Sequence, residues 1–206
     1  MANGTLKVSN IETSSGSGTI TLGQSGETVD FSNATATLNS AMKMTPAFQA
    51  SLGSTLALTD ATLTLLSASV ESYDSDGCYN NTGSTVTLNG ISTPSYAFAP
   101  NVAGKYQLNA TLRGGGDGSN TFEYALGKFY KNGSVLTIPG TSEEYTPIVD
   151  HRANNGANGT ISMNFEVELN GTSDYVQCYF FVATSSPNSP DAHSLCTFGA
   201  HRIIGA

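Results

Sequence analysis

Few residues of this chain are spaced for chemistry, and the best-spaced are two aspartates. Asp74 and Asp76 stand in an Asp-Ser-Asp-Gly run, and carboxylates two apart on a loop can converge on calcium. The other ligands of a calcium-binding loop do not follow, so a solvated turn is the favoured interpretation. Asp74 and Asp76 are calcium candidates only, and no metal is expected.

Histidine and glycine patterns offer no catalytic motif. His151, His193 and His201 lie outside the spacings of metalloprotease and nucleophile-elbow sequences. Gly114 to Gly118 lacks the Lys-Ser/Thr pair of a phosphate-binding loop, so it is interpreted as a hairpin corner. The sequence predicts a protein that is not an enzyme and needs no cofactor.

The three cysteines are Cys78, Cys178 and Cys196. They form no CxxC pair and lack the spacing of a zinc site. Cys178 lies inside an apolar run, where a small buried thiol is expected. A framework of disulfides is therefore not expected.

Composition narrows the classes of partner. The chain of 206 residues has a formal net charge of −8, and its 8 Lys and Arg are scattered. Nucleic-acid binding depends on clustered Lys and Arg, so no nucleic-acid partner is expected. No apolar run approaches the ~18 residues that suggest a membrane span, and the N-terminus does not resemble a signal peptide. Membrane insertion is not expected.

From residue 46 onward the sequence alternates in the period-2 pattern of half-buried strands. Asn89-Gly90, Asn132-Gly133 and Asn170-Gly171 each join two such runs, and Asn-Gly supplies the positive φ of tight hairpins. Many short antiparallel strands with such turns predict an all-β sandwich or jelly roll. The predicted strands lie at about 47–52, 63–73, 85–88, 96–98, 106–112, 122–130, 160–169, 175–183 and 195–204.

Residues 1–43 differ from the rest, because Gly, Ser, Thr and Asn make up more than half of them. Such a segment buries too little apolar surface to offset the ~1–2 kcal/mol per residue that ordering a backbone costs. Short strands at 5–8, 19–22 and 29–31 would need copies of the chain or a host surface to pair with, and a disordered leader is the alternative. The sequence predicts an anchoring segment at 1–43 and a β domain at 44–206. The anchoring candidates are Leu6, Val8, Ile11, Ile20 and Leu22.

Five segments, in this order, resemble the globular heads of the complement C1q and tumour-necrosis-factor family, particularly those at the ends of bacteriophage fibres. They are Thr45–Phe48, Tyr96–Tyr106, Phe129–Ser134, Asp174–Tyr179 and Thr197–Gly205. Residues 5–11 and 18–22 also resemble the leaders of phage fibre and appendage proteins. Collagen-type repeats, which carry the complement heads, are absent, and this disfavours an animal secreted origin.

The resemblance implies a ten-stranded jelly roll that forms a tight homotrimer and leaves its distal loops free to bind a surface molecule. The residues themselves suggest self-association. Tyr175, Tyr179 and Phe181 alternate with the apolar side chains of their strand, so both faces of that strand are largely apolar. We expect these three at an interface between subunits, the alternative being that loops cover them.

Two functions are consistent with these patterns. The first is a virion structural protein assembled in the host cytoplasm, namely a trimeric short fibre, appendage or decoration protein. It would bind capsid or tail proteins through residues 1–43 and present its jelly roll to a host-surface glycan or protein. The second is a soluble, secreted, lectin-like or cytokine-like binding module, which the leader and the lack of a signal peptide disfavour.

Overall fold

The computed structural model describes residue 28 and residues 43–116, 121–152, 157–185 and 189–203. Within these ranges all regular secondary structure is β-strand. Alternation of side chains is clearest in β7 (Gly104–Gly115), where Tyr106, Leu108, Ala110 and Leu112 are buried and the residues between them are partly exposed. One face of each long strand therefore builds the core, and the chain must stack its sheets to cover that face.

The first sheet of the sandwich is centred on β7, which pairs with a long strand on each side. All of its pairings are antiparallel. Its strands, besides β7, are β1 (Ala47–Ser51), β2 (Leu56–Ala57), β4 (Val70–Asp74), β11 (Asn158–Leu169), β13 (Asp191–Ala192) and β14 (Thr197–Arg202).

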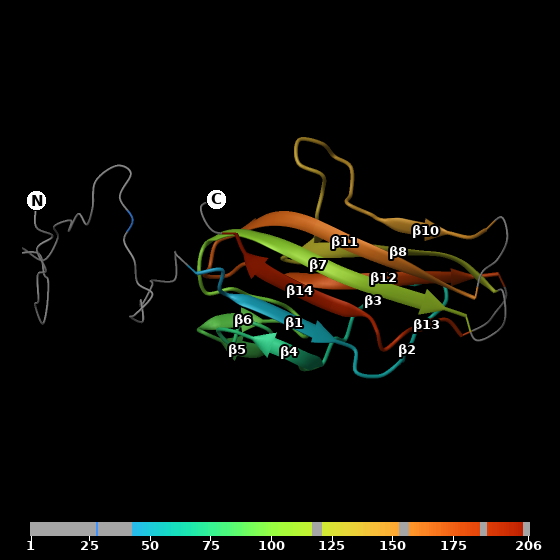
Figure 1. The fold of residues 1–206 in the computed structure, drawn as a ribbon, viewed down its shortest axis with the longest axis horizontal. Coiled ribbons are helices and arrows are strands. Elements are labelled where there is room, and N and C mark those ends of the chain that lie inside the picture. The colour runs from blue at the N-terminus through green and yellow to red at the C-terminus, as the bar shows by residue number, and fades with distance from the viewer. Residues whose placement is uncertain (1–27, 29–42, 117–120, 153–156, 186–188, 204–206) are drawn as a thin grey trace, which may run out of the picture. The chain divides into compact units, whose positions relative to one another are not determined.

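The second sheet is centred on the antiparallel pair β8 and β12, and β5 (Val86–Leu88) and β6 (Ile91–Thr93) form a separate hairpin. The strands of the second sheet are β3 (Thr64–Leu65), β8 (Phe122–Lys131), β9 (Ser134–Val135), β10 (Ile148–Asp150) and β12 (Val176–Thr184). Figure 1 shows the long strands β7, β8, β11, β12 and β14 lying along roughly the same axis, with neighbouring strands of a sheet pointing in opposite directions.

The connections between long strands cross from one sheet to the other. The chain passes from β7 in the first sheet to β8 in the second, returns to β11 in the first, crosses to β12 in the second and ends with β14 in the first. The two layers read β11-β7-β14-β1 and β10-β8-β12-β3. This is an antiparallel jelly-roll β-sandwich, so the predicted fold class is confirmed.

An aromatic cluster fills one part of the space between the layers. Phe48 of β1 stacks on Tyr79 with ring centroids 4.3 Å apart and on Phe98 at 4.8 Å, and it meets the edge of Phe198 at 5.0 Å. All four rings are buried. The buried Tyr79 hydroxyl donates to the Ala68 carbonyl at 2.7 Å, which satisfies its polar atom.

Several predicted strands match observed ones within a few residues, but two do not. The predicted strand 63–73 is wrong as a single strand, because its ends form β3 in one sheet and β4 in the other. Between β3 and β4, buried Leu66 and Ala68 still alternate with the less buried Ser67 and Ser69. The hydrophobic periodicity therefore continues through the connection and does not reveal the break. The predicted strand 96–98 is also wrong: Tyr96 has φ 52°, and Phe98 forms only isolated bridges with Tyr79 and Val176.

Two turn predictions are also corrected. Asn89-Gly90 and Asn132-Gly133 have positive φ and close the β5–β6 and β8–β9 hairpins as predicted. Asn170-Gly171 closes no hairpin, because β11 and β12 lie in different sheets. The predicted hairpin corner at Gly114 to Gly118 begins too early, because Gly114 and Gly115 end β7, and β7 and β8 lie in different sheets. Residues 117 and 118 lie outside the described ranges.

Candidate functional site

The predicted interface residues lie on the outer side of β12. Val176, Cys178, Phe180 and Val182 are buried in the core, as their alternation predicts. Tyr175, just before the strand, and Tyr179 and Phe181 within it are only half-buried. The two-sided apolar character of this strand is confirmed, and the structure places the three candidates toward the surface of the second sheet.

Neighbouring strands extend this surface. Tyr179 packs against Tyr130 of β8 with ring centroids 4.5 Å apart, and Phe181 stacks on Tyr124 at 5.4 Å. The strand register adds half-buried Leu65 and Leu126, and also Ile148, which is 54% exposed. We call this surface the aromatic face. Its members are Leu65, Tyr124, Leu126, Tyr130, Ile148, Tyr179 and Phe181.

The charges beside the aromatic face are paired. Lys128, which lies opposite Tyr179 in the register, forms an ion pair with Glu144. Arg152 stands over the Tyr124 ring at 5.0 Å and forms an ion pair with Asp150. Hydrogen bonds from Arg152 lower the pKa of Asp150 to about 2.

One phenol of the aromatic face, that of Tyr179, is partly withdrawn from solvent. Burial, with a smaller effect of Tyr130 and Tyr175, raises the pKa of Tyr179. A surface of aromatic rings with its neighbouring charges already paired suits contact with another protein surface, where Tyr and Phe are enriched.

The alternative that loops cover the outer side of β12 holds at Gln177. This residue alternates with Tyr175 and Tyr179, but it is buried, and its amide donates to the Ser95 carbonyl at 2.8 Å. The segment around Ser95 therefore takes up the position between the two tyrosines. Tyr179 and Phe181 stay partly accessible.

The calcium candidates lie at the end of β4 and in the turn that follows it, and both accept hydrogen bonds there. The Asp74 carboxylate accepts hydrogen bonds from the backbone N–H of Cys78 at 3.1 Å and of Tyr79 at 2.8 Å. Asp76 accepts from the Ser75 hydroxyl at 2.8 Å. Across the described ranges, no group of three or more His, Cys, Asp or Glu is arranged to hold a metal ion.

The cysteines lie in the core as unpaired thiols. Burial raises the pKa of Cys78 to about 11 and raises that of Cys178 and Cys196 as well. A thiol with a raised pKa is a poor nucleophile at neutral pH. The prediction of a small buried thiol at Cys178 is confirmed.

The sequence analysis missed the contribution of β8 to the aromatic face. Tyr124, Leu126 and Tyr130 are separated by two and four residues, which places them on one face of a strand. The period-2 alternation that identified β12 could therefore have found them. Ile148 carried no such signal, because β10 is three residues long. The anchoring candidates Leu6, Val8, Ile11, Ile20 and Leu22 lie outside the described residues, and so do the three short strands predicted around them.

In the part of the chain that the structure describes, no helix has the length and apolar character to cross a bilayer.

No protein-family model matches this chain, and no curated protein matches it. Solved structures similar to it include the globular domain of zebrafish complement 1qA, at 14% identity and a TM-score of 0.47, covering 77% of this chain and 97% of that one. Murine APRIL is similar in two crystal structures, at pH 5.0 and pH 8.5. They have 10% and 12% identity and TM-scores of 0.43 and 0.42, and each covers 76% of this chain and 98% of the other. At these identities the likeness is one of fold.

Proposed function

We propose that this chain is a non-enzymatic assembly and attachment module that associates with copies of itself through the aromatic face. The observation that supports the proposal is the set of half-buried rings on β8 and β12, centred on Tyr179 and Phe181. Contiguous exposed apolar patches on a folded domain mark interaction sites. A homotrimer is the assembly that the sequence resemblance implies.

We further propose that the module is part of a virion, as a short fibre, appendage or decoration protein. Residues 1–43 would bind a capsid or tail protein, and the jelly roll would project for attachment to a host surface. The polar, low-complexity composition of residues 1–43 supports this assignment, because such a segment needs a partner to become ordered. A secreted cytokine-like module has the same fold and is the competing function.

The trimer is tested by the mass of the full chain in solution, measured by light scattering. We expect three times the chain mass of 21.3 kDa. Phe181→Asp should shift the population to monomer, because it puts a charge into the proposed interface. Tyr73→Asp is the matched control, since Tyr73 is an aromatic residue of β4, 50% exposed and outside the aromatic face. A monomeric or dimeric full chain would refute the trimer.

The virion assignment is tested separately, by locating the tagged chain. Imaging purified particles should show the tag on the capsid or the tail. Recovery of the chain only as a free protein outside cells would instead favour the secreted module. Neither outcome changes the solution mass, so the trimer and the virion role can fail independently.

A further inference from the structure

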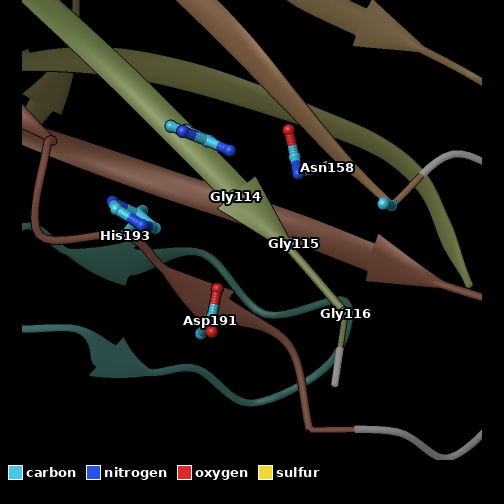
Figure 2. A pocket seen from close by; sticks show the side chains of 8 residues that line it. Gly114, Gly115, Gly116, Asn158, Asp191 and His193 are labelled. Atoms are coloured by element: carbon cyan, nitrogen blue, oxygen red, sulfur yellow. The ribbon is translucent and has the colours of Figure 1, made fainter. Parts of the chain in front are cut away.

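A small polar pocket of about 160 Å³ lies at the end of the first sheet, away from the aromatic face. Figure 2 shows Asn158 of β11, Asp191 of β13 and His193 around the end of β7. Its described lining residues are Arg113, Gly114, Gly115, Gly116, Ala157, Asn158, Asp191 and His193. The function proposed above uses none of these side chains.

The pocket exists because a glycine stands where a strand should carry a side chain. Gly115 pairs with Asn158 on one side and with Asp191 on the other, so these two side chains share its face of the sheet. A Cβ on Gly115 would lie 3.2 Å from the Ala157 carbonyl oxygen, 3.4 Å from the Asn158 Cβ and 3.5 Å from Asp191 Oδ1. Glycine inside a strand marks the close approach of a ligand or of another backbone, and here the backbone of Ala157 comes close as well.

A second row of side chains forms the neighbouring wall. Arg113 precedes Gly115 by two residues on β7, so both belong to the same face. The backbone N–H of His193 donates to the Arg113 carbonyl at 2.8 Å, which places the two residues side by side. His193 Nδ1 accepts from the Leu195 N–H at 3.2 Å. The neutral ring therefore carries its proton on Nε2 and has a donor to offer.

The polar groups of this pocket are available to a ligand. In the described part of the chain, the side chains of Arg113, Asn158 and Asp191 form no ion pair and no side-chain hydrogen bond. A guanidinium and a carboxylate thus share one small pocket without neutralising each other. Such a pair suits a ligand that accepts from one group and donates to the other.

This combination disfavours ligands that carry a net charge and suits a neutral, hydroxyl-bearing one. A phosphate or carboxylate would gain from Arg113 but would be repelled by Asp191, and an ammonium would meet the reverse. A sugar hydroxyl both donates and accepts, so it can bridge Asp191, Asn158 and Arg113. The volume is below the ~300–1,000 Å³ of pockets for drug-sized molecules, which limits the occupant to about one ring.

The pocket lies far along the sandwich from the point where the described chain enters it. Ala47, where the chain enters the sandwich, is opposite His201, which in turn pairs with Gln107 of β7. Gly115 is eight residues further along the same strand, or ~27 Å at about 3.4 Å per residue. The entry point of residues 1–43 and the pocket therefore lie at opposite ends of the sandwich.

We propose that this pocket binds a single neutral sugar residue at the end of a surface glycan. The inference rests on the proposed attachment function and names what that attachment recognises. Arg113, Asn158 and the His193 Nε2–H donate to sugar oxygens, and the Asp191 carboxylate accepts from hydroxyls. Gly115, which carries no side chain, lets the ring approach the strand between Asn158 and Asp191.

The test is a titration of the full chain followed by NMR, with galactose, glucose, mannose, N-acetylglucosamine and inorganic phosphate as probes. We expect saturable amide shifts at Gly114, Gly115 and His193 with one of the neutral sugars, at a dissociation constant near the millimolar range. Phosphate should produce no saturable shift there. The proposal is overturned if none of the four sugars binds at these amides, or if phosphate binds in their place.

Two variants locate the binding. Gly115→Ala adds a methyl group to the pocket floor, where the Ala157 carbonyl oxygen at 3.2 Å must shift slightly to admit it. Asn158→Ala removes one wall, and each variant should weaken sugar binding at least tenfold. Asn164→Ala is the matched control, because Asn164 lies on the same face of β11 and is exposed outside the pocket. Unchanged affinity in both pocket variants would overturn the site. The solution mass of each variant separates this failure from failure of the trimer.

Discussion

At the scale of single residues, backbone space decides which glycines matter. Gly171 has φ 70°, and a Cβ there would lie 2.6 Å from the carbonyl carbon of Val102 and would also strike the Ala103 nitrogen. Gly140 has a similar φ of 78°, but a Cβ there would meet nothing within 4 Å. The two positions separate the cost of a left-handed backbone from the cost of a collision with backbone atoms.

We predict that Gly171→Ala destabilises the protein more than Gly140→Ala does. The left-handed conformation costs ~1–2 kcal/mol for a residue with a Cβ. Both variants should therefore lose that amount of unfolding free energy. Gly171→Ala must also displace the backbone at Val102 and Ala103. Urea unfolding at neutral pH measures both losses, and equal losses would mean that the segment around Val102 yields without cost.

Sequence patterns predicted some of these residue-scale features. Asn89 and Asn132 were assigned positive φ because Asn-Gly is the usual sequence of a tight hairpin, and the structure agrees. Tyr96 also has a positive φ of 52°. Tyrosine has no local preference for that conformation, so only the surrounding tertiary structure can impose it.

At the scale of elements, one carboxylate joins two connections of the sandwich. Asp174, just before β12, accepts from Asn132 in the β8–β9 turn at 2.7 Å and from the Asn170 N–H after β11 at 2.9 Å. It also forms a 2.9 Å ion pair with Lys131 at the end of β8. Burial alone would raise the pKa of Asp174, but these hydrogen bonds outweigh it and hold the pKa below its ordinary value.

We predict that Asp174→Ala lowers the free energy of unfolding by about 1–3 kcal/mol at neutral pH, because three donors lose a charged, buried acceptor. A carboxylate with a depressed folded pKa contributes stability that is fully present above its unfolded pKa of ~3.9 and is lost as the pH falls through the folded value. The difference in the free energy of unfolding between wild type and Asp174→Ala should therefore narrow only in acid. Urea unfolding from about pH 7 to about pH 2 measures it.

Asp76→Ala is the control for this prediction, because Asp76 is exposed and its side chain accepts only from the neighbouring Ser75. Its loss should change stability little at any pH. The difference in unfolding free energy between wild type and Asp174→Ala could instead stay constant down to the lowest pH. That result would show that the stabilisation by Asp174 does not depend on its charge.

Element predictions succeeded where strands are long. β7, β8, β11 and β12 carry enough alternating residues for the pattern to identify them and to say which side faces the core. Very short strands such as β2 and β13 carry no periodicity, and their pairing depends on where the long strands place the chain. The pocket at Gly115 was hidden for the same reason, since β13 supplies Asp191.

At the scale of the whole molecule, the described residues build one continuous hydrophobic core. Every residue of its buried apolar cluster lies between Phe48 and Ala200. The division into an anchoring segment at 1–43 and a domain at 44–206 is still a prediction. It has a direct consequence: if those first residues serve only attachment, the sandwich must fold and associate without them.

We predict that a chain beginning at residue 44 keeps the melting temperature of the full chain within ~2 °C, which for a protein of this size corresponds to less than about 1 kcal/mol. It should also keep the trimer mass, because the aromatic face lies wholly within the sandwich. Association with purified particles should be lost. Calorimetry, light scattering and co-sedimentation measure the three properties. A melting temperature lower by more than ~4 °C, or a monomeric truncated chain, would mean that residues 1–43 belong to the folded trimer, because only burial within it could supply that stability.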